Sequence, residues 1–335
     1  MTLIDYILMK VKFTYYFLFL LFSIKIFAQN PVQDSVAKII EIDSIAQIAT
    51  EDSIIFPKTY WNVGDVKRYN VTTSEIKLEC DTIANQDQYT YNVVIEIENI
   101  YQNETIVKWN FRNVQFNSKS YLNNPFALAN NVSISFKIDQ DGRFLSYTNL
   151  EQTIKQLQLS SEDLENKYLD NPTAIASIKK NVQLYANAEN IIKLFDKDIR
   201  QFHHFYAKNN FTLKSEPFVY QSYMDNLFST SPTPATTSIK LNEIGTAHTN
   251  YIMGSFQEAD KEWLANSWYN YLKDLATKLG SEEPSKDRLK DDIKYYVKTT
   301  SRIKDNGWIS YSIETKKVKF QDTDYTLERR FELVD

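Results

Sequence analysis

Strict alternation of apolar and polar residues is the feature of this 335-residue chain that most constrains its fold. From Tyr89 to Ile97, for example, every second residue is large and apolar. Because successive side chains of a strand point to opposite faces, such a segment buries one face and leaves the other in water. Short turns separate the segments, which is typical of antiparallel strands. The alternating segments run through residues 69–73, 89–97, 107–111, 132–138, 293–303 and 309–313.

The period changes to that of helices in two places. Between Asn149 and about Lys208, Asn149 and Asn171 are candidate N-caps, and the clearest apolar stripe lies in residues 190–206. A second amphipathic helix is predicted over residues 258–279, with Gly280 as its stop signal. A one-sided apolar sheet has to be covered, and these helices are the available covers.

The predicted fold class is therefore α+β: a large, curved antiparallel sheet, half-barrel-like, with helices packed on its concave face. Residues 59–335 form a single domain in this interpretation. Residues 229–237 read as a loop, because Pro232 and Pro234 block regular structure. Residues 138–147 resemble residues 303–311, which indicates either two related strand layers or the same hairpin chemistry used twice. The predicted elements are strands over 60–147, helices over 149–208, strands over 236–256, a helix over 258–279 and strands over 293–334.

The start of the chain has the layout of a secretory signal peptide. Lysines around Met9 precede an apolar run that is too short to span a bilayer, and Ala28 then offers a small residue for cleavage before Gln29. Residues 1–28 are therefore the predicted signal peptide, and residues 29–58 a flexible acidic linker. An uncleaved anchor is the alternative, and whether Met1 or Met9 is the true start is open. The prediction is an exported protein of the periplasm, outer envelope or exterior, soluble after cleavage and without a transmembrane segment in the mature chain.

Charge and glycine usage exclude several classes of partner. The formal net charge is −5 and no basic stripe is visible, so nucleic acid is not an expected partner. The six glycines stand alone, whereas phosphate-binding loops need two or three glycines within a few residues. No cofactor is predicted.

Few residue types suited to catalysis or metal binding occur. Cys80, the single cysteine, follows the apolar phase of a strand, so it is predicted to be a buried packing thiol. The adjacent His203 and His204 are predicted to be solvated helix residues, since a helical zinc pair needs a spacing of three or four. No catalytic residue and no metal ligand is assigned. A pair of Asp or Glu residues needs no local motif, so a hydrolase of that kind stays open.

The entry from Trp61 to Tyr69 has the pattern W-x-V-G-D-x-x-x-Y, and an Asp-Gly hairpin and a late helix-then-sheet arrangement follow. These features resemble uncharacterised exported proteins of Gram-negative bacteria and, more distantly, the periplasmic lipoprotein-carrier and lipoprotein-localisation group. The resemblance touches residues 60–150 and 290–335. It implies binding of acyl chains or other hydrophobic ligands between sheet and helices. The candidate lining of the concave face is Trp109, Phe111, Phe136, Ile138, Phe202 and Trp268.

Three functions follow in order of preference. The first is a non-enzymatic envelope protein that binds a hydrophobic ligand, a lipid or a lipid-linked partner between sheet and helices. The second is a structural or protein-interaction module of the envelope with a fully packed core. The third is the hydrolase. A cavity of about 300 Å³ beneath the helices favours the first function over the second. The ligand, the partner proteins and the oligomeric state are not specified by the sequence.

Overall fold

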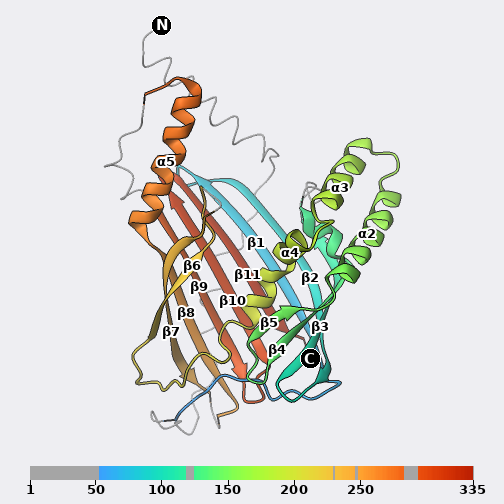
Figure 1. Ribbon diagram of the computed structural model, residues 1–335, viewed down its shortest axis with the longest axis vertical. Coiled ribbons are helices and arrows are strands. Elements are labelled where there is room, and N and C mark those ends of the chain that lie inside the picture. Colours follow the sequence, from blue (N-terminus) through green and yellow to red (C-terminus); the bar gives the residue numbers. More distant parts are fainter. Residues whose placement is uncertain (1–52, 118–123, 229–230, 246–247, 283–292, 335) are drawn as a thin grey trace. The chain divides into compact units, whose positions relative to one another are not determined.

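The computed structural model of the protein describes residues 53–117, 124–228, 231–245, 248–282 and 293–334 (Figure 1). Within these ranges the strands form one antiparallel sheet of eleven strands, which is curved and not closed. The predicted α+β, half-barrel-like class is confirmed. The strands are β1 (Val66–Glu79), β2 (Thr82–Ile100), β3 (Glu104–Phe116), β4 (Ser133–Asp139), β5 (Phe144–Tyr147), β6 (Phe218–Met224), β7 (Thr233–Ile244), β8 (Asn250–Ala259), β9 (Ile293–Lys304), β10 (Ile309–Phe320) and β11 (Thr323–Leu333).

The strand order is β5-β4-β3-β2-β1-β11-β10-β9-β8-β7-β6. Strands β1 to β5 pair consecutively, as do β6 to β11, and the two runs join where β1 pairs with β11. The described strands thus belong to a single sheet and not to two related layers.

The described helices are α2 (Leu150–Lys167), α3 (Pro172–Leu184), α4 (Ala188–Phe202) and α5 (Lys261–Leu279), with a short 3-10 helix, η3, at Pro125–Ala129. Their ends follow local chemistry. Asn171 and Asp260 accept backbone N–H bonds as N-caps of α3 and α5, and Gly280 ends α5 in the left-handed conformation. Asn149 precedes α2 as predicted, but its side chain accepts the Ser135 N–H at 2.6 Å and leaves the helix uncapped.

Helices α4 and α5 cover different parts of the concave face (Figure 1). Beneath α4, apolar side chains of β1, β2, β3, β4 and β11 form the main core. Phe202 of α4 lies edge-on to Tyr69 and Trp109, with ring centroids 5.2 and 5.4 Å apart. Helices α2 and α3 pack beside α4 at the β4 end of the sheet.

The chain enters the domain across two hairpin turns. Ile55, within the predicted linker, exchanges backbone hydrogen bonds with Phe211 at 2.8 Å. Trp61 stacks on Trp308 with ring centroids 4.3 Å apart, and the Tyr60 N–H donates to Asn306 O at 3.2 Å. Residues 53–58 therefore belong to the folded domain. The predicted signal peptide, its cleavage site at Ala28 and Gln29, and residues 29–52 lie outside the described residues.

Cys80 was predicted to be buried, and this is wrong. The residue is exposed in the turn between β1 and β2. Its φ of +48° is not a strand conformation, so β1 ends one residue before Cys80 although the apolar alternation continues to it. The Cys80 N–H donates to Asp322 O at 2.9 Å, which links this turn to the neighbouring turn between β10 and β11.

The predicted solvation of His203 and His204 is also wrong. Helix α4 ends at Phe202, so the following residues turn into the core instead of continuing the helical stripe. His203 is 5 % exposed, and its Nδ1 lies 2.8 Å from Gly142 O. Burial lowers the pKa of both imidazoles to about 4.

The predicted loop at residues 229–237 contains a strand. Strand β7 begins at Thr233 and includes Pro234, and β6, which the sequence pattern did not indicate, pairs with it. Pro234 is tolerated because it is the second residue of β7, where the missing N–H removes a bond only at the end of the ladder.

Candidate functional site

A buried charged network fixes α4 to the sheet. Arg329 of β11 is 5 % exposed, and its guanidinium donates to Glu314 Oε1 at 2.7 Å and lies 3.3 Å from Asp198 Oδ1. It also donates to Gln201 Oε1 at 2.7 Å and to Lys197 O at 3.0 Å, both on α4. Every one of these contacts joins the helix to the sheet or joins two strands.

The two carboxylates of this network share one guanidinium. Burial raises the pKa of Asp198, while the Arg329 charge and the Tyr91 hydroxyl, which donates to Asp198 Oδ2, act in the opposite direction. Both carboxylates are therefore already engaged: each contacts Arg329, and Asp198 in addition accepts from Tyr91 beneath the helix. We therefore interpret Asp198 and Glu314 as structural groups.

The network belongs to a central belt of the concave face. The register places Thr73, Arg329, Glu314, Thr299 and Ser255 in one row across β1, β11, β10, β9 and β8. The next row contains Glu75, Leu327, Lys316, Val297 and Gln257. We call these two rows the central belt.

The second row is half-buried and carries perturbed charges. Burial raises the pKa of Glu75, which accepts a hydrogen bond from Tyr325, and burial lowers the pKa of Lys316. Lys316 Nζ lies 5.0 Å from the centre of the Tyr295 ring and forms no ion pair with the described residues. Poorly hydrated charges beside apolar side chains are typical of functional surfaces, although ion networks also produce them.

Beyond the belt, α5 covers a second and smaller apolar cluster. Leu264 of α5 is buried against Ile293 and Tyr295 of β9. Next to it, Trp268 packs on Phe320 and Phe228 with ring centroids 4.1 and 4.6 Å apart. Other members of the buried cluster are Met224, Ala235 and Ala259.

Helix α5 uses its apolar stripe less completely than α4 does. In α4 the four residues of the apolar stripe are fully buried, and Leu194 beside them is half-buried: the stripe consists of Ile191, Phe195, Ile199 and Phe202. In α5 only Leu264 of the stripe is buried, whereas Trp268, Leu272 and Leu275 are half-buried and Leu279 is 45 % exposed. Tyr271, beside Trp268, is 40 % exposed. Unused apolar surface on the concave side is thus concentrated at α5.

The candidate lining residues fall into two groups. Those of the first group belong to the main cluster, Phe202 on α4 and the others on the strands beneath it, and have no exposed surface: Trp109, Phe111, Phe136, Ile138 and Phe202. A ligand could reach them only by displacing side chains that already touch one another. Trp268 is separate and lies beyond the belt under α5. Their role in binding a ligand remains a prediction.

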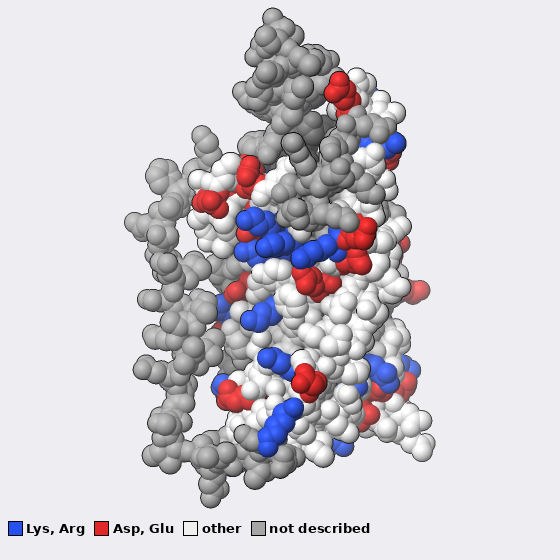
Figure 2. All heavy atoms as spheres, turned by 90° about the vertical axis from the view of Figure 1, so that its left-hand side faces the viewer, with Lys and Arg blue, Asp and Glu red and all other residues white. Residues whose placement is uncertain are grey.

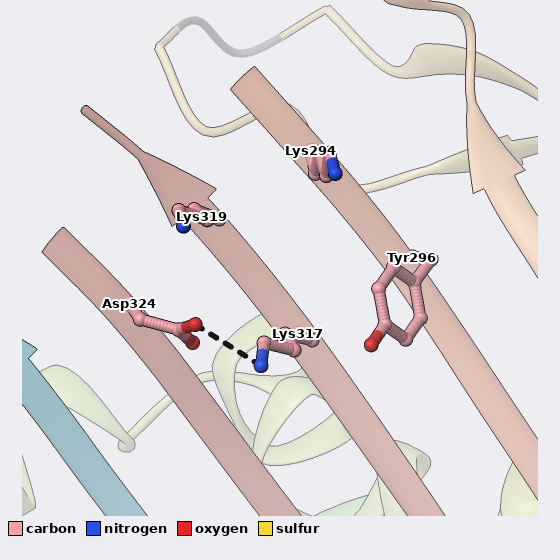
Figure 3. Close-up of a pocket in the computed structure, with 5 residues that line it drawn as sticks. All are labelled: Lys294, Tyr296, Lys317, Lys319 and Asp324. Atoms are coloured by element: carbon pink, nitrogen blue, oxygen red, sulfur yellow. Dashed lines mark ion pairs between the residues drawn. The ribbon is translucent and has the colours of Figure 1, made fainter. Parts of the chain in front are cut away.

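A pocket of about 290 Å³ lies on the opposite, convex face (Figure 3). Lys294 and Tyr296 of β9, Lys317 and Lys319 of β10, and Asp324 of β11 line it. These residues alternate with Ile293, Tyr295, Val318 and Phe320, which pack under α5, so they must project from the other side. The sequence signal is the recurrence of lysine at alternate positions of two strands, which the apolar-polar alternation assigns to the solvent-facing side without indicating a pocket.

The described residues contain no group of three or more His, Cys, Asp or Glu side chains placed to hold a metal ion. Among the helices that the structure describes, none combines the length and the apolar character that crossing a membrane requires.

Comparisons with known proteins give only remote likenesses. No family model and no curated protein matches the sequence. A solved structure reported under "lipid-protein interactions in lipovitellin" aligns with a TM-score of 0.43 and 10 % identity over 82 % of this chain. The alignment spans 25 % of that much longer chain. DynF from the dynemicin biosynthesis pathway of Micromonospora chersina aligns with a TM-score of 0.19 and 6 % identity, over 91 % of this chain and 92 % of that chain. Neither is similar enough to transfer a function.

Proposed function

We propose that this chain is an exported, non-enzymatic protein of the cell envelope that binds a hydrophobic ligand between the sheet and helix α5. The ligand class is an acyl chain, either free or linked to a larger partner. The observation that carries the proposal is the contrast between α4, whose stripe of four apolar residues is fully buried, and α5, whose stripe is fully buried only at Leu264.

The unused surface has the composition that an acyl chain prefers. Trp268, Leu272 and Leu275 offer aromatic and aliphatic area on α5, and Val297, Val318 and Phe320 are half-buried on the strands beneath. Each Å² of apolar surface removed from water contributes about 25 cal/mol, so a chain lying along this surface gains several kcal/mol.

The central belt limits where the ligand can extend. Glu75 and Lys316 stand two strands apart in the second row, about 9.5 Å, and their charged ends need water or a polar partner. The apolar part of a ligand is therefore confined to the α5 side, while a polar head group can lie at the belt. The rings beneath α4 are fully packed, so for that part of the concave face we favour a structural role over ligand binding.

Trp268 provides a local test. A dibrominated fatty acid quenches tryptophan fluorescence only at short range, and Trp268 is the tryptophan that packs on Phe320 and Phe228 under α5. We expect saturable quenching in the full chain and loss of most of it in Trp268→Phe. If quenching is absent, or is unchanged in Trp268→Phe, the acyl-binding proposal is wrong and the structural or interaction module stands.

Binding affinity can be tested with a matched pair of leucines. Leu272→Gln removes half-buried apolar surface of α5, whereas Leu159→Gln changes a leucine of α2 that is 61 % exposed. We expect Leu272→Gln to weaken acyl binding about tenfold, because a loss of about 1.4 kcal/mol corresponds to that factor. Equal affinities of the two variants would count against a site at α5.

Export is tested separately. N-terminal sequencing of the protein recovered from the envelope fraction should begin at Gln29 if cleavage follows Ala28. A start far from Gln29 contradicts the predicted signal peptide without bearing on the α5 surface.

A further inference from the structure

The convex pocket brings together positive charges that do not neutralise one another. Lys294 of β9 and Lys319 of β10 are direct cross-strand partners, and both are exposed. Lys317, two residues away on the same face, is the only one of the three lysines with an ion pair among the described residues, to Asp324 at 3.0 Å. Three ammonium groups and one carboxylate give the pocket a net charge of +2.

Like charges placed directly opposite each other destabilise a sheet. The chain carries more acidic than basic residues, 43 against 38, so this grouping does not follow from composition. Figure 2 faces the side on which β7 and β8 lie in Figure 1, and it shows one larger group of basic side chains with acidic ones beside it, and separate basic side chains below.

The geometry of the pocket suits a compact anion. The side chains of Lys294, Lys317 and Lys319 come from neighbouring strands, and Tyr296 adds a ring and a hydroxyl at the same wall (Figure 3). Lysine acts as a point charge that binds phosphate without a fixed approach angle, and a volume of about 290 Å³ accommodates a phosphate group with a small organic part.

From these observations we infer that the convex pocket is a binding site for a phosphate-bearing ligand, with Lys294 and Lys319 as its principal cations. Lys317 contributes while held by Asp324, and the Tyr296 hydroxyl donates to a phosphate oxygen. The phosphate can belong to a soluble phosphomonoester or to a lipid head group, since the pocket recognises the charge that both share. The site is on the opposite face from α5 and does not depend on the proposed acyl binding.

Two double variants with the same change in charge separate a built site from general electrostatics. Lys294→Gln with Lys319→Gln removes the pocket cations, whereas Lys155→Gln with Lys180→Gln removes two exposed lysines of α2 and α3. All four side chains are exposed, so both proteins should fold, and unchanged circular dichroism checks this. The probes are inorganic phosphate and glycerol 3-phosphate, by calorimetry, and phosphatidylcholine vesicles with or without phosphatidic acid, by co-sedimentation.

We expect the pocket variant to lose about tenfold or more in affinity and the control variant to stay within about twofold of the wild type, with binding weakening as salt increases. Binding of the soluble probes supports a site for free phosphoesters, and binding of phosphatidic acid vesicles alone supports a head-group site. The inference is overturned if no probe binds, or if both double variants lose affinity equally. Quenching by the brominated fatty acid should be the same in both, so failure here is distinct from failure at α5.

Discussion

Replacing Arg329 by methionine tests whether the buried network is what holds α4 on the sheet. The substitution keeps a long apolar stem but removes the guanidinium that contacts Glu314 and Asp198 at 2.7 and 3.3 Å. It also removes the bonds to Gln201 and to Lys197 O. Among the described residues, Asp198, which is 3 % exposed, is then a buried carboxylate with only the Tyr91 hydroxyl as hydrogen-bond partner.

The expected cost is large. Removing one partner from a buried ion pair costs about 3–5 kcal/mol, because the remaining charge is left without compensation. Total stabilities of domains are about 5–15 kcal/mol, so about a fifth or more of the free energy of unfolding is lost. The matched control is Arg330→Met. Arg330 pairs with Glu328 at 2.8 Å with both side chains about one-third exposed, so its loss should cost about 0–1 kcal/mol.

The pH dependence gives a second and independent readout. Burial already raises the pKa of Asp198, and losing Arg329 raises it further. An acid with a raised pKa in the folded state binds more protons when folded, so its stability contribution falls as pH rises above the unfolded value of about 3.9. The deficit of Arg329→Met relative to wild type should therefore be smaller at pH 5 than at pH 7.5.

Urea unfolding followed by circular dichroism measures both quantities. A triple variant that combines Arg329→Met with Asp198→Asn and Glu314→Gln removes the two carboxylates left without their guanidinium. It should recover at least half of the lost free energy of unfolding, because no unpaired charge is then buried. A loss below about 1 kcal/mol, or the same loss at both pH values, would refute the assignment of the network as the anchor of α4.

Two further substitutions test other parts of the core. Gly307→Ala should lower the free energy of unfolding by several kcal/mol, because the residue has a φ of +80° and an added Cβ would lie 2.4 Å from Lys58 O. The control, Gly64→Ala, should cost only about 1 kcal/mol, because Gly64 has a φ of +86° but open space around it. Equal urea midpoints of the two variants would contradict this. His203→Gln should flatten the acid sensitivity of stability. Burial lowers the pKa of His203 to about 4, so its contribution to the free energy of unfolding is lost as pH falls below the unfolded pKa of about 6.5. The loss should be about 2 kcal/mol between pH 6.5 and 5. An equally steep decline in the variant would show that His203 is not responsible.

Much of the fold could be predicted because local signals and tertiary packing agree. The period-two segments became strands, and Asn171, Asp260 and Gly280 mark helix ends by their own hydrogen bonds or backbone conformation. The errors arose where a chain reversal, which a periodic pattern does not encode, decided burial. Cys80 continues the apolar phase of β1 but lies in the turn, and His203 would lie on the solvated side of a longer α4 but follows the last residue of this helix and turns into the core.

The candidate sites were harder to predict because they depend on register between distant segments. Glu314 and Arg329 meet only because β10 and β11 pair as they do, and Asp198 reaches them from a helix more than a hundred residues earlier. One local signal was available. Glu75 and Arg329 occupy inward positions of strands whose other inward residues include Val71 and Phe331, so charge interrupts the apolar phase. Such an interruption predicts an inward polar group, but not its partner.

The central belt explains why one concave face can hold two different kinds of interior. Arg329, which is held on the sheet by Glu314, makes directional bonds to Gln201 and Lys197 of α4, so this helix has one position on the sheet, and the rings beneath it are fully packed. The described contacts of α5 to the sheet include no comparable buried ion pair; it is held by Leu264 and by aromatic contacts around Trp268. Apolar contacts are non-directional and tolerate a shift of the helix. If the proposed acyl ligand binds beneath α5, we therefore expect it to enter by movement of that helix alone, while the belt keeps the larger core closed.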